Sequence, residues 1–225
     1  MAEGASQIQK QDAPQVEAHH YHNSDYNSKN RYYSFAEQIV ETFALSPASV
    51  VEIGIGNGFL TRALREAGVR VTAVDFDAAL RPDLVASVDA LPLESGSHDA
   101  ALCFQVLEHL PFDRVPAAMR ELARVASRWV YISVPDARPS IRFEAARGWS
   151  VRKPLRWHLH GNPLRRPREH VFDGQHYWEI GKRATPESAV IAAMSVKGLA
   201  LERHYRLHPF PYHHFFLFRK TGTTP

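Results

Sequence analysis

The sequence has few of the features that mark secreted or membrane-spanning proteins. Only one of its 225 residues is a cysteine, Cys103, which excludes an internal disulfide framework and any multi-cysteine zinc site. Charged residues and prolines interrupt every apolar run before it reaches the length needed to cross a bilayer. The N-terminus lacks the basic and apolar stretches of a secretory signal. We therefore expect a soluble cytoplasmic protein without membrane insertion.

Short β-branched runs alternate with stretches of helical period over most of the chain. Strands are expected over 49–53, 69–74, 84–88, 98–104 and 128–134, and helices over 31–45, 59–67 and 114–126. Near the end we expect a helix with Thr185 as N-cap that stops at Gly198, and then strands over 199–207 and 213–219. This alternation is typical of an α/β fold, a doubly wound and mostly parallel sheet with helices on both faces.

Two segments depart from this pattern. Residues 1–30 lack a sustained apolar period, and we expect them to form a flexible N-terminal arm to a single domain over 31–220, either disordered or folded over a ligand. Residues 136–185, after the fifth strand, are rich in Arg, His, Trp and Pro and have no clear period. Long irregular stretches inside a compact domain are usually functional, so we interpret this insertion as a lid that carries substrate specificity.

A glycine loop follows the first expected strand. Glycines at positions 54, 56 and 58 come directly after an apolar run, and Glu52 stands two residues before the first of them. Glycine lets the backbone turn sharply and approach a ligand closely. The spacing is G-x-G-x-G and differs from the G-x-G-x-x-G of dinucleotide-binding folds. This pattern favours a nucleotide-like ligand at the start of the following helix.

Polar residues also stand at the ends of the next three strands. Asp75 closes the second strand, where an acid can accept both hydroxyls of a ribose, and Phe76 can lie against an adenine. Asp89 follows the third strand, where it can accept from an adenine amino group, and Gln105 follows the fourth. Open α/β sheets bind ligands at the carboxyl ends of their strands, so these positions predict one shared site.

With these motifs the chain resembles the class I S-adenosylmethionine-dependent methyltransferases, in particular the type 11 group. The resemblance covers residues 31–135 and implies a seven-stranded sheet whose last strand is antiparallel. It also implies S-adenosyl-L-methionine as the cofactor. The positions implied to hold it are Glu52, Gly54, Ile55, Gly56, Asn57 and Gly58 for the methionine part, Asp75 for the ribose, Phe76, Asp89 and Ala90 for the adenine, and Gln105 and Val106 near the sulfonium. The short segment after Asp75 leaves room for only a single helical turn before the third strand.

Three histidines are candidate catalytic bases. His109 follows the fourth strand next to an acid, and His170 and His176 lie in the insertion among aromatic residues. Imidazole titrates near neutral pH and can take a proton from a nucleophile. The remaining histidines show no H-E-x-x-H or other ligand spacing, so the sequence predicts no metal site.

The insertion also suggests the class of substrate. Residues 138–183 contain eleven Lys or Arg and four Asp or Glu, against a net charge of +3 for the whole chain. We predict methyl transfer to an O, N, S or C nucleophile of a small, acidic metabolite. Methylation of RNA, cofactor binding without turnover, and a nicotinamide oxidoreductase remain alternatives, and the sequence leaves the oligomeric state open.

Overall fold

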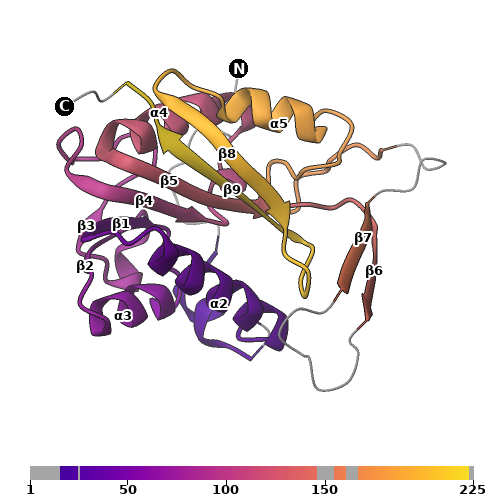
Figure 1. The fold of residues 1–225 in the computed structure, drawn as a ribbon, viewed down its shortest axis with the longest axis horizontal. Coiled ribbons are helices and arrows are strands. Elements are labelled where there is room, and N and C mark those ends of the chain that lie inside the picture. Colours follow the sequence, from indigo (N-terminus) through magenta and orange to yellow (C-terminus); the bar gives the residue numbers. More distant parts are fainter. Residues whose placement is uncertain (1–15, 25, 146–154, 161–166, 223–225) are drawn as a thin grey trace, which may run out of the picture.

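The computed structural model describes residues 16–24, 26–145, 155–160 and 167–222, which build one seven-stranded sheet with flanking helices (Figure 1). Its strands are β1 (Ser49–Ile53), β2 (Arg70–Asp75), β3 (Leu84–Val85), β4 (His98–Phe104), β5 (Ala126–Pro135), β8 (Leu199–Arg206) and β9 (His213–Lys220). The order is β3-β2-β1-β4-β5-β9-β8. The first five strands are parallel, and β9 runs antiparallel to both β5 and β8. The expected doubly wound sheet and antiparallel last strand are confirmed.

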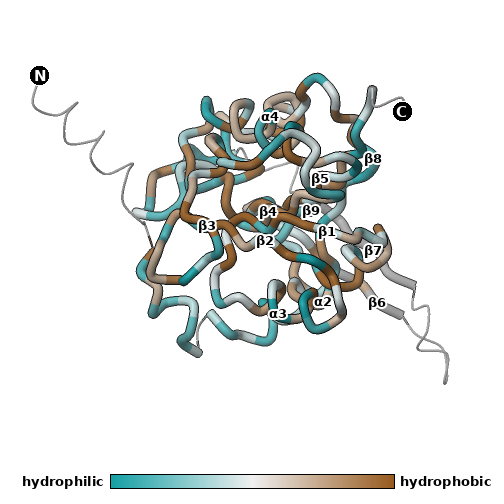
Figure 2. The backbone as a smooth tube through the Cα atoms, turned by 90° about the vertical axis from the view of Figure 1, so that its left-hand side faces the viewer, coloured by the Kyte–Doolittle hydropathy of each residue, from teal (hydrophilic) through white to brown (hydrophobic). Residues whose placement is uncertain are grey.

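Helices cover both faces of the sheet because every central strand is apolar on both sides. The helices α2 (Lys29–Ala44) and α3 (Phe59–Glu66) lie on one face, and α4 (Val115–Val125) and α5 (Glu187–Met194) lie on the other (Figure 1). Successive residues of a strand point to opposite faces. Thus Val50 packs in one buried cluster with Leu64 of α3, and Val51 packs in the other with Met119 of α4. Figure 2 shows the strands as a hydrophobic centre.

Short 3₁₀ turns complete the connections near the strand ends. They are η2 (Ala78–Leu80), η3 (Leu107–His109) and η4 (Phe112–Arg114). The first is the single turn expected between Asp75 and the third strand. No helix among the described residues combines the length and the apolar character needed to span a membrane.

The insertion leaves the sheet at the end of β5 and returns to the same place. It contains a separate two-stranded antiparallel ribbon, β6 (Ser140–Ala145) and β7 (Leu155–His160), which stands apart from the main sheet (Figure 1). Ile180 then pairs in parallel with Asp136. Its N–H donates to the carbonyl of Pro135 at 3.0 Å, and its carbonyl accepts from Ala137 at 2.9 Å. These bonds bring the two ends of the insertion together.

The part of the N-terminal segment that the structure describes has local structure and lies against the glycine loop. Residues 18–22 form a 3₁₀ turn, η1 (Ala18–His22), and α2 begins at Lys29. The rings of Tyr21 and Tyr26 meet edge to face with centroids 5.1 Å apart. The side-chain amide of Asn27 donates to the carbonyls of Tyr21 and Asn23. Residues 1–15 lie outside the described residues.

The start and end of the last helix also differ from the expectation. Pro186, and not Thr185, is the N-cap of α5. The hydroxyl of Thr185 donates instead to the carbonyl of Glu179 at 2.6 Å, which directs this side chain toward the insertion. The helix stops at Met194, ahead of Gly198, which lies in the turn before β8 with φ of +89°.

Candidate functional site

A cavity of about 300 Å³ opens at the carboxyl ends of β1, β2 and β4. Its volume is at the lower end of the range for ligand pockets. The strand ends and the loops after them form one wall, the N-terminal segment and α2 form a second, and a short part of the insertion forms a third. Parallel α/β sheets bind ligands at this edge, as the sequence predicts for this chain.

The glycine loop is shaped by two close approaches. Gly54 has φ of +80°, and a Cβ atom there would lie 2.2 Å from a methyl carbon of Val106. Gly56 has φ of +53°, and a Cβ atom there would lie 3.0 Å from the Tyr26 hydroxyl oxygen. Only glycine fits both positions without movement of these neighbours. The loop residues Gly54, Ile55, Gly56 and Asn57 line the cavity, whereas Gly58 is the left-handed N-cap of α3.

Asp75 lines the cavity with a carboxylate fixed by the backbone. One of its oxygens accepts the N–H of Ile55 and the other accepts that of Asp77, both at 2.9 Å. Burial raises the pKa of Asp75, although these hydrogen bonds oppose that effect. The carboxylate therefore keeps one orientation while its remaining lone pairs can accept from a ligand.

Glu52 also lines the cavity and is 4% exposed. Its carboxyl accepts a hydrogen bond from the hydroxyl of Thr61 on α3. Burial raises the pKa of Glu52 to about 7, with the hydrogen bond from Thr61 acting against the rise. A cationic group in the cavity next to Glu52 would favour its ionised form.

Three more of the expected cofactor positions reach the cavity wall. Phe76 is 43% exposed, which leaves its ring available to a planar ligand. Gln105 has φ of +57°, and its side-chain amide donates to the Ser133 hydroxyl at 3.1 Å. Val106 follows it and closes the cavity under the glycine loop.

The structure does not bring Asp89, Ala90 or His170 to the wall. Both carboxylate oxygens of Asp89 are engaged, one by the guanidinium of Arg114 and the other by the Ser87 hydroxyl. The wall is formed there by the residues just before Asp89, from Ala86 to Val88. The direct adenine contact expected for Asp89 and Ala90, and a catalytic role for His170, are therefore not supported by their positions.

A second part of the wall combines Glu108 and His109, which belong to η3, with His176 of the insertion. The two imidazole centroids are 5.2 Å apart, with 70° between the ring planes. The backbone N–H of Tyr177 donates to the carbonyl of Glu108 at 2.8 Å, which ties the insertion to this turn. Two of the three predicted histidines thus lie together, and His170 supports them by a hydrogen bond at 2.7 Å between its Nε2 and the carbonyl of His176.

The ionisation of these groups follows from their burial. Burial raises the pKa of Glu108 to about 7, with a smaller opposing effect from His176. Burial and the charge of His176 lower the pKa of His109 to about 4, so His109 is neutral at pH 7. Burial would also lower the pKa of His176, but hydrogen bonding to Glu179 and the nearby acids raise it above its ordinary value.

Arg31 and Tyr212 also line the wall, although neither is among the positions expected to bind the cofactor or act as a base. The guanidinium of Arg31 lies over the ring of Tyr26, 4.4 Å from its centroid. Tyr212 lies in the turn between β8 and β9, and its hydroxyl donates to Glu179. An arginine at the start of the first expected helix, near several tyrosines, was the available signal for Arg31. Tyr212 carries no comparable signal.

Among the described residues of the insertion, none of the Lys or Arg side chains lines the cavity. Arg138 pairs with Asp136 and Glu187, Lys182 with Glu179, and Arg183 with Glu169. Gln175 and His176 are the described residues of the insertion on the wall. For the described residues, the charge argument from residues 138–183 therefore does not extend to this cavity.

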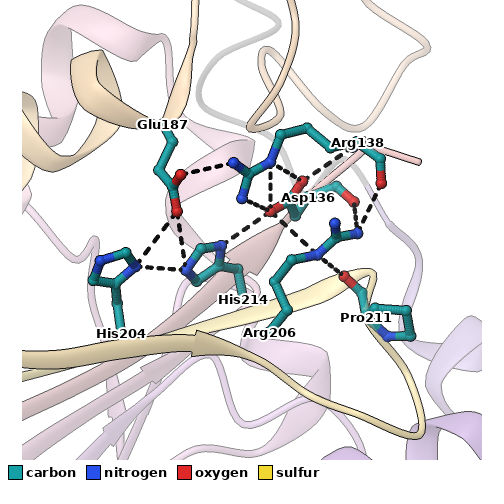
Figure 3. Close-up of polar contacts among 7 residues, drawn as sticks. All are labelled: Asp136, Arg138, Glu187, His204, Arg206, Pro211 and His214. Atoms are coloured by element: carbon teal, nitrogen blue, oxygen red, sulfur yellow. Dashed lines mark hydrogen bonds and ion pairs between the residues drawn. The ribbon is translucent and has the colours of Figure 1, made fainter. Parts of the chain in front are cut away.

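A second polar cluster lies outside the cavity lining, between the end of β5, the start of α5 and the strands β8 and β9 (Figure 3). Asp136 is its centre, with a fully buried carboxylate. It accepts from Nδ1 of His214 at 3.0 Å and from the guanidinium of Arg138, which also donates to Glu187. Arg206 donates to the carbonyls of Pro211 and Arg138. Every charged group in this cluster has a partner.

Comparison with known proteins agrees with this geometry. Residues 51–132 match the family model of a methyltransferase domain, Methyltransf_11. A ubiquinone biosynthesis O-methyltransferase of Nitrosospira multiformis is 32% identical over 112 residues, which cover 42% of this chain and 46% of that protein. The chain thus spans less than half the length of the curated relatives it matches first.

Solved structures show the same fold at low sequence identity. A protein from Pyrococcus horikoshii OT3 superposes with a TM-score of 0.57 at 14% identity, over 88% of this chain and 95% of that chain. The magnesium protoporphyrin IX methyltransferase of Synechocystis PCC 6803, with bound S-adenosylmethionine, superposes with a TM-score of 0.55 at 16% identity. The superposition covers 85% of this chain and 80% of that chain. Residues 51–132 thus match a methyltransferase domain, and the strand order of the sheet is that of the class I S-adenosylmethionine-dependent methyltransferase fold.

Proposed function

We propose that this protein transfers a methyl group from S-adenosylmethionine to a nucleophile of a small anionic metabolite. The observation that supports this most is the continuity of one cavity. The same cavity holds most of the positions expected for the cofactor and a second polar wall of Arg31, Glu108, His109, His176 and Tyr212. A cofactor and a substrate can therefore share one enclosed space.

The residues present fit the cofactor. A side chain at Gly54 would overlap Val106 and one at Gly56 would press on Tyr26, so glycine at both positions keeps backbone at the cavity wall. The carboxylate of Asp75 can accept ribose hydroxyls, and the exposed ring of Phe76 can cover an adenine. Glu52 suits the cationic amino group of the methionine part. When bound, S-adenosylmethionine supplies a methyl group that its sulfonium charge already activates.

The main task of the protein is then to align the substrate and exclude water. Tyr21 and Tyr26 cover the glycine loop from the N-terminal segment, which makes that side of the cavity apolar. Alignment alone can supply effective molarities of ~10⁵ M or more, so a general base is not required for every nucleophile. His109 and His176 remain predicted proton acceptors because both rings line the cavity.

Arg31 supports an anionic substrate. Its side chain lines the cavity, and none of the described acidic residues forms an ion pair with it. A guanidinium binds a carboxylate or phosphate through paired N–H groups. Methylation of an oxygen would agree with the activity named for the relative from Nitrosospira multiformis, although a nitrogen, sulfur or carbon nucleophile fits the wall equally well.

Calorimetric titration with S-adenosylhomocysteine tests the cofactor. We expect micromolar binding to the wild-type protein, loss of that binding in Asp75→Ala, and no binding of NADH. Asp113→Ala is the matched control because this exposed acid is not part of the cavity lining. Equal binding in wild type and Asp75→Ala, or binding of NADH alone, would contradict the proposal.

A methylation screen with carboxylated and phosphorylated small molecules tests the substrate class. Arg31→Gln should raise KM and leave kcat nearly unchanged, whereas Arg183→Gln, at an exposed ion pair, should change neither. Salt-sensitive RNA binding and RNA methylation would instead support the macromolecular alternative. Cofactor binding without turnover over the whole panel would support a binding protein of the same fold.

A further inference from the structure

We propose that Glu108, His109 and His176 form a binding site for a divalent transition-metal ion on the wall of the cavity. Each residue offers one ligand atom, and the three atoms lie within 4.8 Å of one another. The site deepens the proposed function, because its role in catalysis rests on methyl transfer in the same cavity. Binding of the ion itself does not depend on that function.

Glu108 is the strongest single observation. The residue is fully buried, and neither of its carboxylate oxygens has a hydrogen-bond partner among the described residues. Burial of a carboxylate without partners is costly, and natural proteins avoid it unless a ligand or ion satisfies the group. The carboxyl also lines the cavity, so an ion can reach it without a change of fold.

The two imidazoles are oriented as metal ligands usually are. Nδ1 of His109 lies 3.0 Å from the carbonyl oxygen of Gln175, so this nitrogen carries the proton and donates it. Nδ1 of His176 lies 3.3 Å from a carboxylate oxygen of Glu179. Histidines that bind metals typically donate their second ring N–H to a carbonyl or a carboxylate in this way. We assign metal binding to Nε2 of each ring, since the group is formed by one atom from each residue.

The supports of the two rings are themselves held in place. Tyr212 donates to the carboxylate of Glu179, and Lys182 pairs with its other oxygen at 3.2 Å. Since the bond from Tyr177 to Glu108 also joins the two segments, the three ligands are positioned before any ion arrives.

A second group of potential ligands, Glu187, His204 and His214, serves as an internal contrast (Figure 3). Here Nδ1 of His204 and Nε2 of His214 lie 3.0 Å apart and hydrogen bond to each other. Glu187 accepts from the guanidinium of Arg138 at 2.7 Å. These groups already satisfy one another, and the neighbouring guanidinium groups oppose a further cation. We therefore assign the ion to the group at Glu108.

The ligand set suggests the ion and its effect. Two imidazoles and one carboxylate suit Zn²⁺, Co²⁺ or Fe²⁺ better than Mg²⁺ or Ca²⁺. The remaining coordination positions face the cavity, where a hydroxyl oxygen of the substrate can occupy one. On binding, the hydroxyl loses its proton to solvent. Its oxygen then attacks the methyl carbon, the C–O bond forms, and the C–S bond breaks with its electron pair left on sulfur. The site thus favours hydroxyl-bearing substrates.

The sequence alone does not predict this site, because its ligands follow no known spacing. Glu108 and His109 are adjacent, and His176 reaches them only through the fold of the insertion. The pair Glu108-His109 and the motif around His176 were visible in the sequence as separate candidates for acid–base chemistry. Their convergence is a property of the tertiary structure.

The test is titration of the chelator-treated full chain with Co²⁺, followed by its visible absorption and by competition with Zn²⁺. We expect one Co²⁺ per chain and loss of that binding in Glu108→Gln and in His176→Asn. Glu179→Gln, which removes the support of His176, should weaken binding about 10- to 100-fold. His204→Gln should bind as wild type does, because it affects only the second group.

Three results would overturn the proposal. They are unchanged Co²⁺ binding in Glu108→Gln and His176→Asn, loss of binding in His204→Gln, and absence of binding to a wild-type chain that still binds S-adenosylhomocysteine. Circular dichroism and S-adenosylhomocysteine binding show that each variant is folded. If Co²⁺ binds as expected but S-adenosylhomocysteine does not, the proposed function fails and the metal site stands.

Discussion

Two buried acidic residues at the carboxyl edge of the sheet, Asp136 and Glu108, both have histidine neighbours. They differ in whether their carboxylate oxygens have hydrogen-bond partners. Around Asp136, two arginines and a histidine satisfy a fully buried carboxylate (Figure 3). Around Glu108, two histidines are close, but both carboxylate oxygens lack a partner among the described residues. Both acids are buried, so burial alone does not separate them.

The difference separates a structural role from a ligand-binding one. The Asp136 cluster joins β5, β8, β9 and α5, and each of its charged groups has an ion-pair or hydrogen-bond partner. The Glu108 group joins η3 to the insertion, lines the cavity, and contains a carboxyl whose oxygens lack a hydrogen-bond partner among the described residues. Buried polar groups without partners are rare in native proteins and need an explanation at each position where they occur. Variants of both acids and a change of pH test this difference between the Asp136 cluster and the Glu108 group.

The largest effect is expected from Asp136→Ala. Removal of this carboxylate leaves Arg138 and Arg206 with uncompensated charge, and breaking a buried ion pair in this way costs about 3–5 kcal/mol. Urea denaturation followed by circular dichroism measures the loss. Glu169→Ala, at an exposed ion pair with Arg183, is the control and should stay within about 0.5 kcal/mol of wild type. Similar losses of unfolding free energy in Asp136→Ala and Glu169→Ala would contradict the structural role given to the Asp136 cluster.

Gly54→Ala should also be costly, because the new Cβ atom would overlap the side chain of Val106. We expect a loss of about 1–3 kcal/mol from this overlap and from the positive φ. The double variant with Val106→Ala should regain the part due to overlap and leave the part due to the backbone. If the double variant is no more stable than Gly54→Ala, the whole loss of stability comes from the backbone conformation at position 54.

Acid should weaken the Asp136 cluster in a defined range. Burial opposes ionisation, but the hydrogen bonds from His214 and Arg138 and the charge of Arg206 lower the pKa of Asp136 from 3.8 to about 2. The folded state therefore holds fewer protons on this group than the unfolded state. Its contribution, roughly 2 kcal/mol, is complete above pH 4 and is lost as the pH falls toward 2. Urea denaturation over this range should show a slope that Asp136→Asn reduces.

The smallest effect on stability is expected from Glu108→Gln in the presence of a chelator. This change replaces a buried carboxyl that has no hydrogen-bond partner among the described residues, so the free energy of unfolding should stay within about 1 kcal/mol of wild type or rise. The same urea experiment measures it. A loss as large as that of Asp136→Ala would mean that Glu108 is satisfied in the folded protein and would contradict the comparison.

Much of the fold was predictable because the central strands carry strong signals. The expected bounds of β1 and β4 agree with the structure at both ends, since β1 is buried throughout and β4 is buried at every position except Asp99. The strand expected over 84–88 is only two residues long, because its pairing with β2 stops at Val85. The ribbon of β6 and β7 was not predicted, since residues 136–185 show no period from which strands can be inferred.

The candidate site was predicted to the correct edge of the sheet, but not in its side-chain partners. Asp75, Gln105 and the glycine loop follow directly from strand ends, so their place was predictable. The engagement of Asp89 by Arg114 depends on how η4 packs, and local sequence does not encode that contact. The same holds for Glu108 and His176, which only the return of the insertion brings together.

The pairing of Ile180 with Asp136 also bears on how such a protein can change over evolutionary time. The insertion leaves and re-enters the sheet at one point. The length of the chain between Asp136 and Ile180 therefore does not change how the strands of the sheet pair. The entropic cost of closing a flexible loop grows by only about 0.6 kcal/mol for each doubling of its length. Descendants can therefore lengthen, shorten or replace this segment, and so acquire new substrates, while the cofactor half of the molecule is inherited unaltered.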